Sequence, residues 1–187
     1  MNDFYIAMGA NLPSGKCSPS DTLNAAISDF GQRNMVVEGI SAFYRTPCFP
    51  AGAGPDYINA AVHLKSDLSS KDMLAHLHEI EAKHGRERLQ RWGMRTLDLD
   101  LVACGDSVLP DLETFEHWRT LSPDLQRQAA PTDLILPHPR LQDRAFVLVP
   151  LRDIAAEWTH PVLKKTVIEM CNALAPEALA EIVVLES

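Results

Sequence analysis

The chain has 187 residues, a hydrophobic share of 46%, and a formal net charge of -8. This length suits one domain with a real core, and such an acidic chain is not expected to have nucleic acid as its main partner. No apolar run approaches the roughly 20 residues that cross a bilayer, and the N-terminus lacks the basic start and apolar core of a signal peptide. The four cysteines are scattered. We therefore expect reduced thiols, a cytoplasmic location and no membrane partner.

The first hundred residues predict alternating strands and helices. Apolar and β-branched residues indicate strands at residues 4–8, 35–44, 57–64 and 97–102. Ser18 begins a helix that Gly31 ends, and Ser69 begins a second helix after the third strand. The order strand, helix, strand, strand, helix, strand is typical of an α+β ferredoxin-like sandwich, a mainly antiparallel sheet with helices packed on it.

The residues after the fourth strand give weaker signals. Residues 146–150 predict a further strand, and residues 162–174 and 178–185 are expected to pack at the C-terminal end.

The second helix carries three histidines. We interpret His76, His78 and His84 as ordinary surface or edge histidines, because their spacing includes no carboxylate partner for a metal.

The stretch from Arg91 to Val102, Arg-Trp-Gly-Met-Arg-Thr-Leu-Asp-Leu-Asp-Leu-Val, carries the strongest chemical signal. Because strand side chains alternate between faces, Asp98 and Asp100 project from one face and the leucines between them from the other. Two carboxylates roughly 7 Å apart need counter-charge, and Mg²⁺ takes such oxygen ligands while keeping sites for phosphates. The pair therefore suits a metal-bound nucleotide, and an ordinary acidic strand face is the alternative.

Positive charge is concentrated just before this pair. Residues 83–95 hold one lysine and four arginines against one glutamate, a local charge of +4 in an acidic chain. Guanidinium groups stay protonated and bind phosphate oxygens in bidentate fashion. An arginine loop beside a carboxylate pair suits a polyphosphate, although a solvated basic loop would show the same composition.

The same stretch resembles the signature of the 6-hydroxymethyl-7,8-dihydropterin pyrophosphokinase family. Five other blocks match in the same order: Tyr5-Ile-Ala-Met-Gly-Ala-Asn-Leu, Phe43-Tyr-Arg-Thr-Pro, Pro55-Asp-Tyr-Ile-Asn-Ala-Ala-Val, Pro137-His, and Arg144-Ala-Phe leading to Pro150-Leu151. The resemblance runs from the first strand to about residue 160 and implies the ferredoxin-like fold. It also implies transfer of a diphosphate from ATP to the pterin alcohol, with release of AMP, in folate biosynthesis. We expect a monomer.

The resemblance implies a role for each matching residue. The expected catalytic residues are Arg88, Arg95, Asp98 and Asp100, and the two aspartates would also hold two Mg²⁺ ions. The expected pterin-binding residues are Thr46, Pro47, Tyr57, Asn59, Trp92 and Phe146, with the rings of Tyr57 and Phe146 stacking on the flat pterin. The expected nucleotide-binding residues are Glu81, Arg86, Arg91, Trp92, His138 and Arg144.

The chain also departs from the family pattern. About thirty residues separate the aspartate strand from Pro137-His138, where the family has a short connection, and apolar residues within this insert, at about 106–133, predict a short helix. We interpret the insert as a surface excursion of a single domain spanning 1–187; a lid or an oligomer contact is the alternative. Because the arginine loop is one residue short and Leu89 stands near a family lysine, two other functions stay open. These are a catalytically quiet pterin- or nucleotide-binding module and a magnesium-dependent nucleotidyl transferase.

Overall fold

The computed structural model describes residues 1–31, 35–48, 52, 54–85, 95–122, 125 and 130–186. The strands in this part of the chain are β1 (Asn2–Ala10), β2 (Val36–Ile40), β3 (Tyr44–Thr46), β4 (Tyr57–Ser66), β5 (Asp98–Cys104) and β6 (Val183–Val184). The helices are α1 (Pro19–Gly31), α2 (Ser70–Lys83), α3 (Leu112–Thr120), α5 (Ala145–Ala155), α6 (Val167–Asn172) and α7 (Pro176–Ala180), and a 3-10 turn, η1 (Leu141–Asp143), precedes α5.

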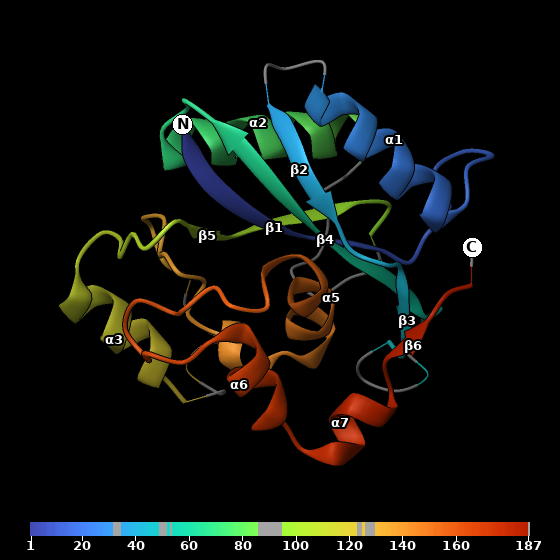
Figure 1. The fold of residues 1–187 in the computed structure, drawn as a ribbon. Coiled ribbons are helices and arrows are strands. Elements are labelled where there is room, and N and C mark those ends of the chain that lie inside the picture. The colour runs from blue at the N-terminus through green and yellow to red at the C-terminus, as the bar shows by residue number, and fades with distance from the viewer. Residues whose placement is uncertain are drawn as a thin grey trace.

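The strands form one antiparallel sheet in the order β5-β1-β4-β3-β6, with β2 also paired to β4. Helices α1 and α2 cover one face of this sheet, and α5 and α6 lie on the other (Figure 1). Because β1 pairs with both β4 and β5, the first strand runs through the middle of the sheet. This arrangement confirms the α+β sandwich with a mainly antiparallel sheet.

Local capping explains where α1 and α2 begin and end. The Ser18 hydroxyl accepts the Asp21 N–H at 3.2 Å while the Asp21 carboxylate accepts the Ser18 N–H at 2.9 Å, a reciprocal pair that satisfies two helix-start donors. Ser69 begins α2 by accepting the Asp72 N–H at 3.1 Å. Gly85, with φ of 81°, follows the end of α2 in the left-handed conformation that favours glycine. Both predicted helix starts are confirmed.

Strand alternation divides the core between the two faces. On β1, the side chains of Phe4, Ile6 and Met8 are buried against α1 and α2, whereas Tyr5 is buried in a second cluster with residues of α5 and α6. Ala7 projects to the same face as Tyr5 but is only partly buried. The face beneath α1 and α2 is thus filled, while the α5 face is less completely covered at Ala7.

Two predicted strands differ from the structure. Residues 146–150 lie in helix α5, with Pro150 inside it, and not in a strand. A short apolar run fits a buried strand and a buried helix equally well, and here apolar residues recur beyond the predicted strand at Leu151 and Ile154, three positions apart as on one face of a helix. The predicted strand 35–44 is divided into β2 and β3, because the Ser41 hydroxyl accepts the Ala61 N–H at 2.8 Å in place of a backbone carbonyl.

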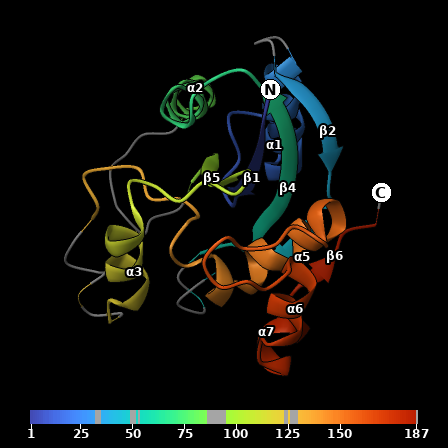
Figure 2. The same ribbon diagram turned by 60° about the vertical axis from the view of Figure 1, so that its left-hand side comes forward.

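The insert contains the predicted short helix, α3, which lies apart from the two helix layers (Figure 2). Phe115 of α3 is fully buried, and its ring centroid is 5.7 Å from that of His160. The neighbouring Trp158 donates its indole N–H to the carbonyl oxygen of Gly105 at 2.9 Å. The loop between α5 and α6, which contains Trp158 and His160, therefore contacts both helix α3 and Gly105 at the start of the insert. Across the described ranges, no helix combines the length and the apolar character that a bilayer crossing requires.

We expect Phe115→Ala to destabilise the protein by about 3 to 5 kcal/mol, because it removes a buried ring and leaves a cavity beside His160. Leu112→Ala on the same helix is the matched control: that side chain is exposed, so the change should stay within about 0.5 kcal/mol. Urea unfolding followed by circular dichroism measures both values. Equal losses in the two variants would contradict an anchoring role for Phe115.

Candidate active site

Asp98 and Asp100 lie on one face of β5, as their spacing predicts. Their side chains are 22% and 43% exposed, and Leu99 between them is buried in the core under α1 and α2. The aspartates thus project to the opposite face, which α5 covers only in part. Both carboxylates are accessible to a ligand from that side.

Small residues on the neighbouring strands leave space beside the two carboxylates. Gly9 of β1 pairs with Asp98 on one side and with Asn59 of β4 on the other, and Ala7 pairs in the same way with Asp100 and Ala61. Directly paired residues project to the same face of a sheet. A Cβ atom added at Gly9 would lie only 3.0 Å from the Asn59 side-chain oxygen, so this position has room for hydrogen alone. Gly9 and Ala7 could not be assigned to the site from the sequence, because only the strand register shows which residues they adjoin.

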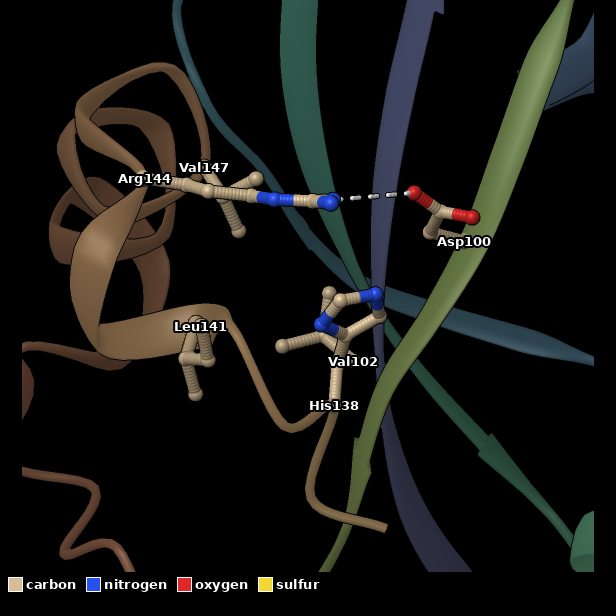
Figure 3. A pocket seen from close by; sticks show the side chains of 6 residues that line it. All are labelled: Asp100, Val102, His138, Leu141, Arg144 and Val147. Atoms are coloured by element: carbon tan, nitrogen blue, oxygen red, sulfur yellow. Dashed lines mark ion pairs between the residues drawn. The ribbon is translucent and has the colours of Figure 1, made fainter. Parts of the chain in front are cut away.

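Each aspartate faces one arginine. Nη1 of Arg95 is paired with Oδ1 of Asp98, and Nη1 of Arg144 lies 3.9 Å from Oδ2 of Asp100 (Figure 3). Burial lowers the pKa of Arg144 while the charges of the two aspartates raise it, and a guanidinium remains protonated in proteins. The counter-charge that the carboxylate pair requires therefore comes from two arginines on different segments.

His138 lies beside the Arg144–Asp100 pair, in a pocket lined by Asp100, Val102, His138, Leu141, Arg144 and Val147 (Figure 3). Its backbone N–H donates to the Val102 carbonyl oxygen at 2.7 Å, and its Nδ1 accepts the Arg140 N–H at 3.1 Å. Burial first, and then the charge of Arg144, lowers the pKa of His138 from 6.5 to about 3. The ring is therefore neutral near pH 7, and because Nδ1 accepts, its proton is on Nε2.

Asn11 fixes the point where the chain enters β5. Its side-chain oxygen accepts the Arg95 N–H at 2.8 Å, and the N–H groups of Asn11 and Leu12 donate to the Arg95 carbonyl oxygen at 3.0 and 3.1 Å. The side-chain amide of Asn11 also donates to the carbonyl oxygen of Pro55 at 3.2 Å. The sequence indicated no role for Asn11 beyond its place in the first matching block. The structure makes it the residue that positions the Arg95 backbone.

Glu81, one of the expected nucleotide-binding residues, contacts the strand that carries the two aspartates. It is buried on α2, and its Oε1 accepts the N–H of Leu99, the residue between the two aspartates, at 2.7 Å. This contact fastens the middle of β5 to α2. Glu81 therefore positions the carboxylate strand, and its expected contact with the nucleotide remains a prediction.

Three of the expected pterin-binding residues lie together where β3 pairs with β4. The Asn59 amide donates to the Thr46 hydroxyl at 2.7 Å, both residues are buried, and Tyr57 pairs with Thr46 across the strands. Burial chiefly raises the pKa of Tyr57, so its phenol stays protonated. Pro47 follows directly and is exposed. Asn59 pairs with Gly9 of β1, which in turn pairs with Asp98 of β5, so these residues adjoin the carboxylate pair across the sheet.

Phe146 comes from helix α5 and not from a strand. Its side chain is 41% exposed, and the Arg144 guanidinium lies 5.8 Å from its ring centroid. Phe146 is therefore not a core aromatic residue. Its exposed ring can stack on a flat ligand.

Part of the predicted site is not described. Arg86, Arg88, Arg91 and Trp92 lie outside the described residues, so their expected roles remain predictions. At the start of the basic stretch, Lys83 and His84 contact Asp29 at 2.6 and 2.9 Å. The Asp29 carboxylate offsets the charge of Lys83, so less uncompensated positive charge lies next to the site than the sequence suggested. It is also a carboxylate partner for His84, which the spacing of residues along α2 did not predict.

A model of the 7,8-dihydro-6-hydroxymethylpterin-pyrophosphokinase (HPPK) family matches residues 5–156. The 2-amino-4-hydroxy-6-hydroxymethyldihydropteridine pyrophosphokinase of Synechocystis sp. is 39% identical over 164 residues, which cover 84% of this chain and 73% of that protein. The protein of the same name from Haemophilus influenzae is 33% identical over 158 residues, covering 84% of each chain.

Among solved structures, the Plasmodium falciparum HPPK-DHPS wild type is similar with a TM-score of 0.63 and 13% identity, covering 91% of this chain and 44% of that one. A second crystal structure, of an HPPK-DHPS in complex with substrates, has the same TM-score at 11% identity and covers 92% and 45%. At this identity the likeness concerns the fold alone. The chain spans less than half of the length of these solved chains.

We expect the free energy of unfolding to fall on acidification because the folded protein resists protonating His138. With a pKa of about 3 in the folded state against 6.5 when unfolded, this group's stabilising effect is complete above pH 6.5 and is lost as the pH falls toward 3. Between pH 7.5 and 5, the wild type should lose about 1 to 2 kcal/mol more than His138→Gln. Urea unfolding of both proteins at the two pH values provides the comparison, and parallel losses would contradict the neutral ring.

Proposed function

The chain belongs to the 7,8-dihydro-6-hydroxymethylpterin-pyrophosphokinase family, and from this we propose that it transfers a diphosphate from ATP to the hydroxymethyl group of 6-hydroxymethyl-7,8-dihydropterin, releasing AMP, with its active site on the α5 face of the sheet. Pyrophosphokinase activity in folate biosynthesis is the function of this family. The observation that carries the assignment of the site is the pair formed by Asp98 and Asp100, each facing one arginine beside a strip of small residues.

The carboxylate pair is the phosphate end of the proposed site. Two partly exposed carboxylates fit Mg²⁺, which prefers oxygen ligands; Asp98 and Asp100 would hold two such ions, which would neutralise phosphate charge and orient the triphosphate. Arg95 and Arg144 already form ion pairs with Asp98 and Asp100, respectively. Once the aspartates have other partners, both guanidinium groups become available to phosphate oxygens a short distance away.

The neutral ring of His138 adds one donor at this end. Because its Nδ1 accepts from the Arg140 backbone, its Nε2–H is the group that can donate to a phosphate oxygen without adding a charge. Pyrophosphoryl transfer gains most from positioning and from stabilising charge on the phosphates. The described residues can contribute both to positioning the phosphates and to stabilising their charge.

The pterin end of the proposed site lies where β3 and β4 adjoin Gly9. The Thr46 hydroxyl fixes the orientation of the Asn59 amide, which leaves the amide oxygen on the side of Gly9. An amide held in this way can recognise the donor edge of a pterin, and the aromatic rings of Tyr57 and Phe146 can stack on its faces. Offset ring stacking adds about 0.5 to 1.5 kcal/mol for each pair.

We also propose that residues 1–187 act as one domain and as a monomer. In support, β6 near the C-terminus pairs with β3, so both ends of the chain contribute to one sheet. The insert at about 106–133 is proposed as a surface excursion, because none of the residues that line the described pocket comes from it. Light scattering after size-exclusion chromatography measures the mass in solution.

The reaction products test the proposed function directly. Incubated with ATP, Mg²⁺ and 6-hydroxymethyl-7,8-dihydropterin, the protein should form equal amounts of AMP and of a pterin that carries two additional phosphates. Chromatography of nucleotides and pterins quantifies both. ADP would mean attack at the wrong phosphorus, pyrophosphate release would favour a nucleotidyl transferase, and binding without turnover would favour a quiet module.

We expect Asp98→Asn and Asp100→Asn each to lower kcat at least about a hundredfold while the fold is retained, because each removes one negative oxygen ligand from the phosphate end. Asp106→Asn is the matched control, since Asp106 is exposed just beyond the end of β5. Circular dichroism checks the fold, and steady-state kinetics at saturating Mg²⁺ gives kcat. Near wild-type turnover in either aspartate variant would remove the carboxylates from the mechanism.

We expect Gly9→Ala to weaken binding of the dihydropterin about tenfold, because the added methyl group would lie 3.0 Å from the Asn59 oxygen and displace the amide. Gly31→Ala is its control: a Cβ at Gly31 meets nothing within 4 Å. Calorimetric titration with the pterin gives both dissociation constants. If the two variants bound alike, Asn59 would not form the pterin edge.

A further inference from the structure

Strand β3 carries part of the proposed pterin end, although its own pairing in the sheet is short. It contains three residues, Tyr44–Thr46, and its outer neighbour β6 contains two. The break at Ser41 separates it from β2, so three paired positions connect it to β4 and the centre of the sheet. A strand with so few backbone partners depends on side-chain contacts for its exact position.

Asp153 of α5 supplies such a contact through one carboxylate oxygen. Its Oδ2 accepts the Tyr44 hydroxyl at 2.8 Å and the Ala42 backbone N–H at 3.2 Å. Burial first, and then the hydrogen bond to Asp153, raises the pKa of Tyr44 to about 12, so the phenol is protonated and donates at neutral pH. One side chain of α5 therefore binds both β3 and the segment that leads into it.

Helix α5 is a firm support for this contact. Leu148 and Leu151 are buried in the core cluster that includes α6, and the Cys171 thiol of α6 donates to the Leu148 carbonyl oxygen at 3.3 Å. Next to Asp153, Ile154 lies against Gly39 of β2, where an added Cβ would be 3.4 Å from the Ile154 Cγ2. Because α5 is packed along its length, its bond to β3 fixes the strand on the helix.

Tyr44 and Thr46 both adjoin Asn59, the proposed pterin-edge residue of β4. Tyr44 pairs with Asn59 directly, and the Thr46 hydroxyl accepts the Asn59 amide at 2.7 Å from the diagonal position. Since Tyr44 and Thr46 are two residues apart on one strand, they project to the same face of the sheet. A shift of β3 would therefore move the hydroxyl that orients the amide.

We propose that Asp153 is a positioning residue for pterin binding and that it acts through Tyr44. By holding β3 on α5, it keeps the Thr46 hydroxyl where it orients the Asn59 amide toward the ligand. This inference rests on the proposed function, which assigns Asn59 to the edge of the pterin. A hydrogen-bonding group that is already oriented loses less conformational freedom on binding. Loss of the Asp153 contact should therefore weaken pterin binding.

The nucleotide end of the proposed site is attached separately. The His138 N–H donates to the Val102 carbonyl oxygen of β5 at 2.7 Å, and the Arg144 N–H donates to the Leu141 carbonyl oxygen at 3.3 Å. These bonds connect the nucleotide end to β5 and to η1, and not to β3. Loss of the Asp153 contact should therefore leave nucleotide binding nearly unchanged.

The opposite end of the same sheet face provides matched controls. There Tyr5 of β1 is also a buried tyrosine, and its ring stacks on His63 with the centroids 4.8 Å apart. Asp3 is also a carboxylate bound to a neighbouring strand, with Oδ1 2.7 Å from His63 Nε2. Tyr5→Phe and Asp3→Ala thus remove the same groups as Tyr44→Phe and Asp153→Ala, but far along β1 from the pterin residues.

The experiment compares these four variants and Asp153→Asn in the full chain. Calorimetric titration measures the dissociation constant of a non-hydrolysable ATP analogue with Mg²⁺, and that of the dihydropterin with this analogue at saturation. Steady-state kinetics gives kcat and the KM of each substrate, and a thermal scan gives the melting temperature.

Asp153→Ala should weaken the dihydropterin about tenfold and raise its KM, with the ATP analogue within about twofold of wild type. Tyr44→Phe leaves the Ala42 bond in place and should weaken the pterin about threefold. Asp153→Asn keeps an acceptor oxygen, so its pterin affinity should stay within about twofold of wild type. Both control variants should leave both ligands within about twofold.

A double-mutant cycle with Thr46→Val separates orientation of the amide from general stability. That background lacks the hydroxyl that holds Asn59, so Tyr44→Phe should have little further effect on pterin affinity. Additive losses in the cycle would overturn the inference. If Asp153→Ala unfolds below the assay temperature, the milder Tyr44→Phe and its cycle decide the outcome.

Four other results would also overturn the inference: equal weakening of both ligands, unchanged pterin affinity in Tyr44→Phe, a loss in Asp153→Asn as large as in Asp153→Ala, or matching losses in the two controls. The products of the wild-type reaction test the proposed function independently, because AMP and pterin diphosphate can form whether or not Asp153 affects affinity. A wild type that binds no pterin would overturn both.

Discussion

Repulsion between two carboxylates on one face of a strand is the constraint on which this site depends. At roughly 7 Å and an effective dielectric constant near 20, the repulsion between Asp98 and Asp100 is about 2 kcal/mol. Arg95 and Arg144 offset it, one from the start of β5 and one from the start of α5. In the proposed site, the two carboxylates and the two guanidinium groups are therefore paired with one another before any phosphate binds.

Space is the second requirement, and β1 provides it. In the centre of the sheet, Gly9 and Ala7 replace the larger side chains that a covered sheet face would carry, and they do so beside the two aspartates. The opposite face of the same strand is filled by Phe4, Ile6 and Met8. One strand thus supports the core on one face and leaves the other open for a ligand, which is possible because successive side chains alternate.

Buried polar residues hold this open face in position. Asn11 fixes the Arg95 backbone and Glu81 fixes the Leu99 backbone, so the aspartate strand is held at its entry and at its middle. Buried side chains with satisfied hydrogen bonds restrict a strand to one position, whereas exposed ones would compete with water. The position of the two aspartates therefore depends on residues that do not line the proposed site.

The sequence by itself determined the local features: the capped starts of α1 and α2, the alternation that puts Asp98 and Asp100 on one face, the short helix of the insert, and the family. Each depends on residues within one or two turns or on a motif of consecutive residues. Only the tertiary structure decided that 146–150 is helical, since packing decides between helix and strand for a short apolar run.

The tertiary structure also decided the partners of the charged and polar groups. Asn11 meets Arg95 at a separation of 84 residues, and His84 meets Asp29 at a separation of 55. Such contacts follow from sheet register and from the placement of α1 beside α2, which no local periodicity encodes. For that reason the sequence identified the charged residues of the proposed site, but only the folded chain showed which of them lie on the same face of the sheet and which contact the backbone of β5.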